Sequence, residues 1–286
     1  MKIVKSSGER LAPERILLMS AEGGGKSSFA ATIPGAVFFD LESSTDKLNV
    51  HERAEVEDEV TGKPRPPRDL AEFKAFLAHY AEPANHPSAI VIDTWDWLVR
   101  MIEIYVCRKK DWDVVADGSY KVGAESLMSA VREVIAELDR FQRATGAHLV
   151  FLSHATVRMV YPLDGEKFNA YSMRCRDEAA LILREWCTLI MYAEIDADNP
   201  DLRKVTCAKT KTVPAKNRLC LPTVMPLNSG TWGEIDKIRR MDPMVRAAEV
   251  FKGHPKETET LDWLGRQANR RNALAHLMTK LESETK

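Results

Sequence analysis

The chain has 286 residues, of which 41 are basic and 42 acidic, so its formal net charge is -1. This balance excludes a wholly basic nucleic-acid binder and an acidic-tail protein, although it permits a local basic patch. No apolar run approaches the ~20 residues that span a bilayer, and the charged N-terminus lacks the apolar stretch of a signal peptide, so we expect a cytoplasmic protein without membrane contact. The five cysteines form no CxxC pair, which indicates reduced thiols and argues against a zinc site.

Short apolar runs alternate with helical patterns along the first half of the chain. The runs cover residues 15–19, 35–39, 89–92 and 148–152. Because they are apolar throughout, they predict strands buried on both faces of a parallel sheet. The polar residues that end each run predict a site at the carboxyl edge of that sheet. Helical spacing of apolar residues predicts helices around 70–80 and 127–141, with Asp69 and Ser126 as candidate caps.

The remaining segments complete an α/β fold. Residues 51–69 are charged and contain three prolines, which predicts an exposed loop. Strand-like segments follow at 188–194, 204–208 and 218–227, and from about residue 236 the pattern is helical again. We therefore expect a mainly parallel central sheet flanked by helices in residues 1–235, and a small helical extension in residues 236–286.

The strongest motif follows the first apolar run and matches the Walker A pattern G-x-x-x-x-G-K-[ST], with serine in place of the first glycine. Glycines let backbone N–H groups turn inward around phosphates, and the N-terminus of the following helix adds a favourable dipole. Lys26 would reach the β- and γ-phosphates, and the Ser27 hydroxyl would ligate Mg²⁺. The motif therefore predicts a site for ATP and Mg²⁺. Its predicted binding residues are Ser20, Glu22, Gly23, Gly24, Gly25, Lys26, Ser27 and Ser28.

Polar residues at the ends of three other runs complete the predicted catalytic set with Lys26. Asp93 ends an apolar run as a Walker B aspartate does, and it would support the metal. The next residue is Thr94 rather than glutamate, so we expect Glu42 to activate the attacking water. His154 would sense the γ-phosphate. The alternatives are a solvated or helix-capping role for Glu42 and a locally satisfied His154.

These motifs together resemble the RecA-type recombinase core. More narrowly, the chain resembles phage-encoded RecA-like P-loop ATPases of the Sak type over about residues 12–228. The narrower likeness rests on Phe39-Asp40-Leu41-Glu42, Ser153-His154-Ala155, Leu183-Arg184-Glu185-Trp186 and Ala215-Lys216-Asn217-Arg218 followed by Leu221-Pro222. The resemblance implies a protein of the host cytoplasm that forms a ring or filament with itself and acts on single-stranded DNA. A single-strand-binding protein is a candidate further partner.

Residues 203–218 contain six basic side chains and no acidic one. The resemblance implies that Lys216 and Arg218 reach across a subunit boundary to a neighbour's γ-phosphate. A solvent-exposed basic hairpin and direct DNA binding are the alternatives.

A second basic segment, residues 155–177, interleaves cations with aromatic residues. Cations can follow a single-strand backbone while aromatic rings stack on bases, and the resemblance places a DNA-binding loop here. The predicted contacts are Arg158, Lys167, Arg174 and Arg176. Residues 107–123 are another candidate loop, and either segment could be a plain surface loop.

The sequence thus predicts a DNA-stimulated ATPase that promotes annealing or homologous pairing of single-stranded DNA. Three alternatives stay open: a helicase-like or loader-like DNA ATPase, a P-loop small-molecule kinase, and a protein that holds ATP as a structural switch without turnover.

Overall fold

The computed structural model describes residues 11–267 and 269–284. Its central strands are parallel and lie in the order β9–β1–β7–β6–β2. They are β1 (Arg15–Ser20), β2 (Ala36–Asp40), β6 (Ala89–Asp93), β7 (His148–Val160) and β9 (Leu189–Ile195). The sheet is extended by the parallel β3 (Glu52–Arg53) and by the antiparallel β10 (Arg203–Thr206), β11 (Lys216–Asn217) and β12 (Val224–Pro226). The expected α/β fold with a mainly parallel sheet is confirmed.

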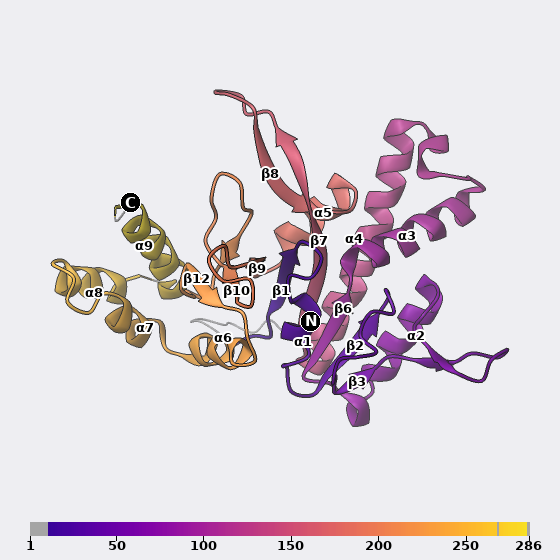
Figure 1. Cartoon of the computed structure of the whole chain (residues 1–286), viewed down its shortest axis with the longest axis horizontal. Helices are drawn as coiled ribbons and strands as arrows, with labels where there is room; N and C mark the ends of the chain where they lie inside the picture. Colours follow the sequence, from indigo (N-terminus) through magenta and orange to yellow (C-terminus); the bar gives the residue numbers. More distant parts are fainter. Residues whose placement is uncertain (1–10, 268, 285–286) are drawn as a thin grey trace, which may run out of the picture.

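Helices cover both faces of this sheet (Figure 1). Because successive strand residues point to opposite faces, an entirely apolar strand serves two cores. One core packs Leu17 and Phe151 against the helices α2 (Leu70–Tyr80), α3 (Trp95–Lys110), α4 (Tyr120–Thr145) and α5 (Asp177–Trp186). The other packs Ile16 and Val150 against α1 (Lys26–Ala30) and α6 (Thr231–Arg240).

Of the two residues expected to cap helices, one does so and the other does not. The Asp69 side chain accepts hydrogen bonds from the backbone N–H groups of Ala71 and Glu72, both at 2.9 Å, so it caps α2 as predicted. Ser126 is not a cap, because α4 already begins at Tyr120 and Ser126 lies inside the helix.

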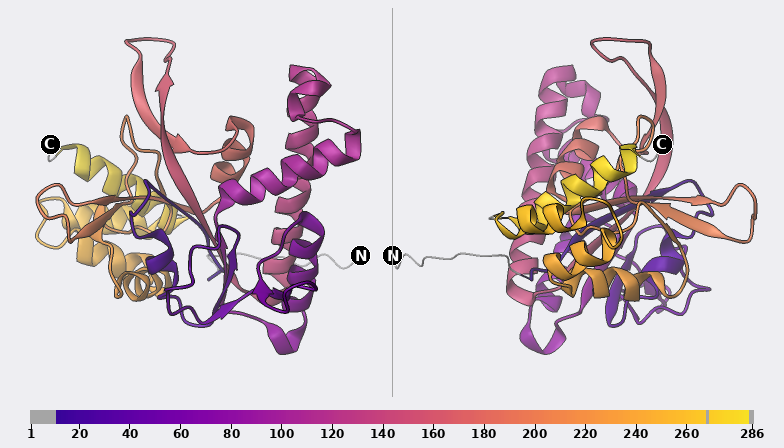
Figure 2. Two further views of the ribbon diagram at one scale, coloured as in Figure 1. Left: turned by 45° about the vertical axis from the view of Figure 1, so that its right-hand side comes forward. Right: turned by 90° about the vertical axis from the view of Figure 1, so that its left-hand side faces the viewer.

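The fourth strand does not end at His154. β7 continues to Val160, turns, and returns as the antiparallel β8 (Phe168–Met173), and the resulting hairpin projects from the body of the protein (Figures 1 and 2). The prediction of a loop across residues 155–177 was therefore wrong. The β-branched and aromatic residues of each arm are stabilised by pairing with the other arm, which a single run of sequence does not reveal.

Residues 107–123 are also not an open loop. They contain the last turn of α3, the short helix η2 (Val115–Gly118) and the first turn of α4. Gly123 allows this compact arrangement, because an added Cβ would lie 2.1 Å from the carbonyl oxygen of Val115. The charged segment 51–69 is largely exposed, as expected, but it contributes β3 and a small hairpin of β4 (Val56–Glu57) and β5 (Pro64–Arg65).

The C-terminal helices form two groups. Trp232 and Ile235 of α6 pack against the sheet, so the expected boundary after residue 235 falls inside this helix. The helices α7 (Pro243–Val250), α8 (Glu257–Gly265) and α9 (Arg270–Glu284) share a separate apolar cluster with Cys220. We propose that these three helices form the small helical extension that the sequence predicted.

His148, at the start of β7, gives the fold a predictable pH dependence. Its Nδ1 accepts a hydrogen bond from the backbone N–H of Glu14 at 3.0 Å. Burial, followed by the charge of Arg239, lowers the pKa of His148 from 6.5 to about 4. The unfolded chain therefore takes up a proton at a pH where the folded chain does not, and the free energy of unfolding falls as the pH drops from about 6.5 toward 4.

Denaturant titrations at pH 7 and pH 5 measure this effect. His148→Gln keeps an acceptor for the Glu14 N–H, and we expect it to show the smaller loss of stability. Glu14 has the opposite influence at lower pH, because burial raises the pKa of its carboxyl. Equal losses in the variant and the parent would contradict the role of His148.

Candidate nucleotide site

The phosphate loop connects β1 to α1 and needs glycine at three points. Gly23 and Gly25 adopt left-handed backbone conformations, with φ of 72° and 87°. Gly24 lies directly against Ser20, because an added Cβ would lie 2.4 Å from the Ser20 Oγ. Serine in the first motif position is therefore accommodated by the absence of a side chain at Gly24.

Lys26 is buried, and it has no carboxylate within ion-pair distance in the described part of the chain. Its Nζ donates to the Ser20 Oγ at 3.2 Å and to the Ala21 carbonyl oxygen at 3.3 Å. Burial lowers the pKa of Lys26, and the Asp93 and Glu42 carboxylates oppose that shift. A buried ammonium held only by neutral oxygens fits a phosphate group, which would supply the missing negative charge.

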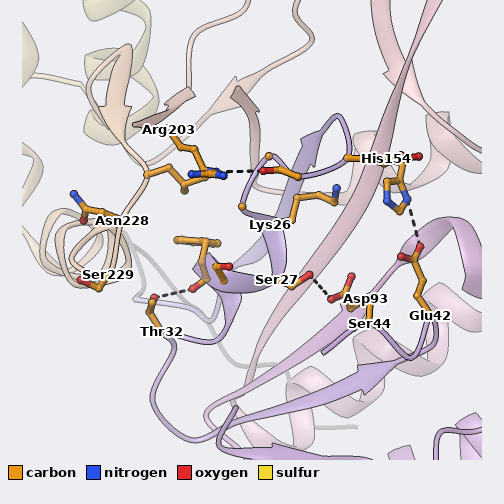
Figure 3. A pocket seen from close by; sticks show the side chains of 17 residues that line it. Lys26, Ser27, Thr32, Glu42, Ser44, Asp93, His154, Arg203, Asn228 and Ser229 are labelled. Atoms are coloured by element: carbon orange, nitrogen blue, oxygen red, sulfur yellow. Dashed lines mark hydrogen bonds and ion pairs between the residues drawn. The ribbon is translucent and has the colours of Figure 1, made fainter. Parts of the chain in front are cut away.

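Two oxygen ligands for Mg²⁺ lie beside the loop. The Ser27 hydroxyl donates to the Asp93 Oδ2 at 2.6 Å, so the start of α1 meets the end of β6 here (Figure 3). Burial raises the pKa of Asp93 to about 6, with smaller contributions from Asp40 and Glu42. A hydroxyl and a carboxylate are the hard oxygen donors that Mg²⁺ prefers, so these residues would hold the metal of a bound nucleotide.

Glu42 and His154 lie on the other side of Asp93 and contact each other, with the Glu42 Oε1 3.3 Å from the His154 Nδ1 (Figure 3). Thr94 donates to the same Glu42 oxygen at 2.7 Å. These two contacts hold Glu42 at the wall of the cavity that contains the phosphate loop. Asp40 has a different task, since its carboxylate accepts from the backbone N–H and the hydroxyl of Thr45 and so holds the loop after β2.

Asp96 is a site residue that the sequence analysis missed. Its carboxylate accepts hydrogen bonds from the Ser153 hydroxyl and the His154 backbone N–H, both at 2.7 Å, and lies 3.1 Å from the His154 Nδ1. It stands in the first turn of α3, three positions after Asp93. An acidic residue so close behind a Walker B aspartate is a usable signal, although its partner 58 positions away is visible only in the fold.

The cavity at the phosphate loop has a volume of about 710 Å³ and includes residues far along the chain. At its other end the Arg203 Nε donates to the Gly23 carbonyl oxygen at 3.2 Å. The remaining lining residues at this end are Phe29, Thr32, Leu227, Asn228 and Ser229. None of them was predicted to belong to the site.

A second cavity of about 1240 Å³ adjoins the first, and Glu42 and His154 line both. It brings together the two candidate DNA segments. Its arginines and tryptophans are Trp97, Arg100, Arg108, Trp112, Arg174 and Arg176. Arg174 pairs with Glu22 and Arg176 with Glu103, at 3.0 and 2.8 Å.

The other two predicted DNA contacts lie on the hairpin, outside this cavity. Arg158 pairs with Asp177 and donates to the Cys175 carbonyl oxygen at 2.7 Å. Lys167 is exposed in the turn before β8.

Lys216 and Arg218 are remote from the phosphate loop of their own chain. Lys216 pairs with Ile190 near the start of β9, whereas the loop follows the opposite end of the sheet. The Lys216 Nζ donates to the carbonyl oxygens of Arg184 and Glu185 at the end of α5. Neither residue can therefore contact a nucleotide bound to the same subunit.

The family profile described as an AAA domain matches residues 12–219. The chain belongs to this AAA-domain family. Because the chain belongs to this family, the protein is a P-loop NTPase, and the geometry of the phosphate loop between β1 and α1 agrees with that. The family match ends close to the last strands of the sheet and covers every predicted catalytic residue.

Other comparisons add little. No curated protein matches the chain. One similar solved structure is the RadB recombinase, with 10% identity and a TM-score of 0.38, covering 68% of this chain and 80% of that one. No helix in the described part of the chain is long and apolar enough to cross a membrane.

Proposed function

We propose that this P-loop NTPase is a RecA-like recombination ATPase of the Sak type, which binds single-stranded DNA and promotes annealing or homologous pairing. The observation that supports it is the shared wall of the two cavities. Glu42 and His154 face the nucleotide site on one side. On the other side they face a cavity lined by four arginines and two tryptophans together with five acidic residues. DNA in the second cavity would contact the same residues that act on the γ-phosphate.

The proposed hydrolytic roles follow from the site. Lys26 binds phosphate, Ser27 and Asp93 hold Mg²⁺, and the Glu42 carboxylate accepts the proton of the attacking water. His154 contacts Glu42 and begins the extended part of β7. A change at the γ-phosphate can therefore be passed along one continuous strand to the hairpin.

DNA binding would require exchange of ion partners. Arg174 and Arg176 already pair with Glu22 and Glu103, so DNA phosphates would replace those carboxylates. The Arg100 guanidinium lies 5.4 Å from the centroid of the Trp97 ring, so a cation and a stacking surface occur together. Both kinds of contact are used by proteins that bind single strands without sequence preference.

We also propose that Lys216 and Arg218 act on the nucleotide of a neighbouring subunit in a ring or filament. Their distance from their own phosphate loop is what such a role requires. A cation that acts in this way contributes ~10³–10⁵ in rate where it is an arginine finger.

A steady-state ATPase assay with and without single-stranded DNA tests the function. We expect DNA to stimulate turnover, and the stimulation to decline steeply with salt because phosphate contacts release counterions. Arg176→Ala should reduce stimulation more than basal turnover. Arg140→Ala, an exposed arginine on α4, is the matched control. ATP turnover that DNA leaves unchanged would contradict the DNA role.

Light scattering on the same samples reports assembly. A monomer under every combination of ATP and DNA would contradict the proposed action of Lys216 and Arg218 across a subunit boundary.

The second cavity also favours one alternative, a P-loop kinase that binds a small acceptor beside Glu42 and His154. In that case an acceptor would be phosphorylated and DNA would have no effect, so the same assay separates the two functions.

A further inference from the structure

The imidazole of His154 stands between two carboxylates at the wall that the two cavities share. Its Nδ1 lies 3.3 Å from the Glu42 Oε1 and 3.1 Å from the Asp96 Oδ2 (Figure 3). The donor atoms of the three residues all lie within 4.8 Å of one another. Glu42 follows β2, Asp96 lies in the first turn of α3 and His154 lies in β7, so three separate segments of the chain converge here.

The two carboxylates lack a permanent positive partner. Within the described residues, no lysine or arginine lies within ion-pair distance of either one. Lys26 feels their charge only at longer range, because its Nζ donates to the Ser20 hydroxyl and the Ala21 carbonyl oxygen. The His154 Nδ1 therefore faces two negative oxygens. A bare nitrogen lone pair would be repelled there, so this nitrogen carries either a proton or a metal ion.

The spacing of these atoms fits the coordination sphere of a metal. Zn²⁺ binds imidazole nitrogen and carboxylate oxygen at about 2.0–2.2 Å, which places neighbouring ligand atoms about 2.8–3.6 Å apart in tetrahedral or octahedral geometry. The two distances from the His154 Nδ1, 3.3 and 3.1 Å, fall within this range. The nitrogen and each carboxylate oxygen therefore already stand at the separation of two ligands of one ion.

Both carboxylates are also held from behind, as the ligands of metal sites usually are. The Thr94 hydroxyl donates to the Glu42 Oε1 at 2.7 Å. Asp96 accepts from the Ser153 hydroxyl and the His154 backbone N–H, both at 2.7 Å. All three residues of the group line the second cavity, so an ion and its water ligands can enter from that side.

We propose that Glu42, Asp96 and His154 form a binding site for a divalent transition-metal ion, with Zn²⁺ as the best fit. The site is separate from Ser27 and Asp93, the ligands expected for Mg²⁺. Imidazole is a good ligand for Zn²⁺, whereas Mg²⁺ prefers oxygen donors alone, so the two ions sort between the two sites. The missing CxxC pairs argue only against a cysteine site, and this one uses nitrogen and oxygen.

Zn²⁺ bound here would inhibit ATP hydrolysis. A carboxylate that shares its charge with a bound dication is a far weaker base, so Glu42 could no longer accept a proton from the attacking water. The binding of the ion requires nothing of the proposed function. The inhibition rests on it, because it depends on the proposed role of Glu42.

Titration of the full-length, nucleotide-free protein with Co²⁺ tests the site, because Co²⁺ occupies zinc sites and gives visible absorption bands. We expect a single Co²⁺ per chain, displaced by Zn²⁺, with no charge-transfer band from a cysteine thiolate. Asp96→Asn and His154→Gln should each weaken binding about tenfold or more, since loss of even an outer-shell partner typically costs that much. Asp201→Asn and His79→Gln, at exposed positions between β9 and β10 and in α2, are the matched controls and should bind as the parent does.

ATP turnover in excess Mg²⁺, measured with and without Zn²⁺, tests the inhibition. Zn²⁺ should lower turnover of the parent and of Asp201→Asn about tenfold or more, because the base is lost. Asp96→Asn should be inhibited much less at the same Zn²⁺ concentration. Each protein is compared with itself, so an effect of the substitution on basal turnover does not enter the comparison.

Each result bears on one proposal. Co²⁺ binding that survives both substitutions unchanged overturns the site, as does a thiolate band in the parent, whose spectrum needs no variant. The proposed ATPase would then stand, and the His154 Nδ1 would carry a proton. Co²⁺ and Zn²⁺ binding without loss of turnover overturns the inhibition. A parent that binds Co²⁺ as expected but never hydrolyses ATP contradicts the proposed function and leaves the metal site intact.

Discussion

Lys26→Ala is expected to lower ATP turnover by on the order of 10²–10³-fold, because it removes a preorganised cation from the phosphate site. The Lys26 ammonium is buried and held only by the Ser20 hydroxyl and the Ala21 carbonyl oxygen. Its charge is therefore free to act on a phosphate. Phosphate release under saturating ATP measures the effect.

Lys47→Ala provides the control, because Lys47 is exposed in the loop after β2. It should leave turnover unchanged. The Lys26 variant should stay folded, since its alanine removes a charge from a buried position. Normal turnover in folded Lys26→Ala would overturn the hydrolytic mechanism.

Glu42→Gln is expected to separate ATP binding from hydrolysis. The glutamine keeps an oxygen that can accept from the Thr94 hydroxyl, which donates to the Glu42 Oε1 at 2.7 Å. It cannot accept a proton from water. Turnover should fall on the order of 10²–10⁴-fold, the usual contribution of a general base, while the dissociation constant for ATP changes little.

Glu55→Gln is the matched substitution at an exposed glutamate near β3. Single-turnover hydrolysis and ATP binding should both be normal in it. If Glu42→Gln hydrolysed ATP at the parent rate, the base would be another group, and Asp96 is the carboxylate nearest to His154.

The strands at the centre of the fold could be predicted because their signal is local. Runs of apolar residues such as Ala89–Ile92 have few stable arrangements other than a doubly covered strand. The phosphate loop could be predicted for the same reason. Its backbone turns need glycine at Gly23 and Gly25, and its lysine and serine follow directly. The Asp69 cap is a third local feature, since donor and acceptor lie within three residues.

Features that depend on distant partners were missed or misplaced. The extension of β7 past His154 exists because β8 pairs with it, and neither arm is distinctive alone. The last strand-like segment, expected over 218–227, shortened to the three residues of β12 because only these pair with β10. The helical part was expected from residue 236, but α6 begins at Thr231, where Trp232 can pack against the sheet.

The amino-acid sequence by itself determined that this protein has a phosphate loop, a parallel sheet and a set of polar strand ends. Each of these depends on residues within a few positions of one another. Only the tertiary structure decided how the two ends of the cavity differ. Asp96 meets His154 across 58 positions and Arg203 meets Gly23 across 180, because the order of strands in the sheet brings them together. Strand order follows from the packing of the whole chain, and hydrophobic periodicity carries no information about it.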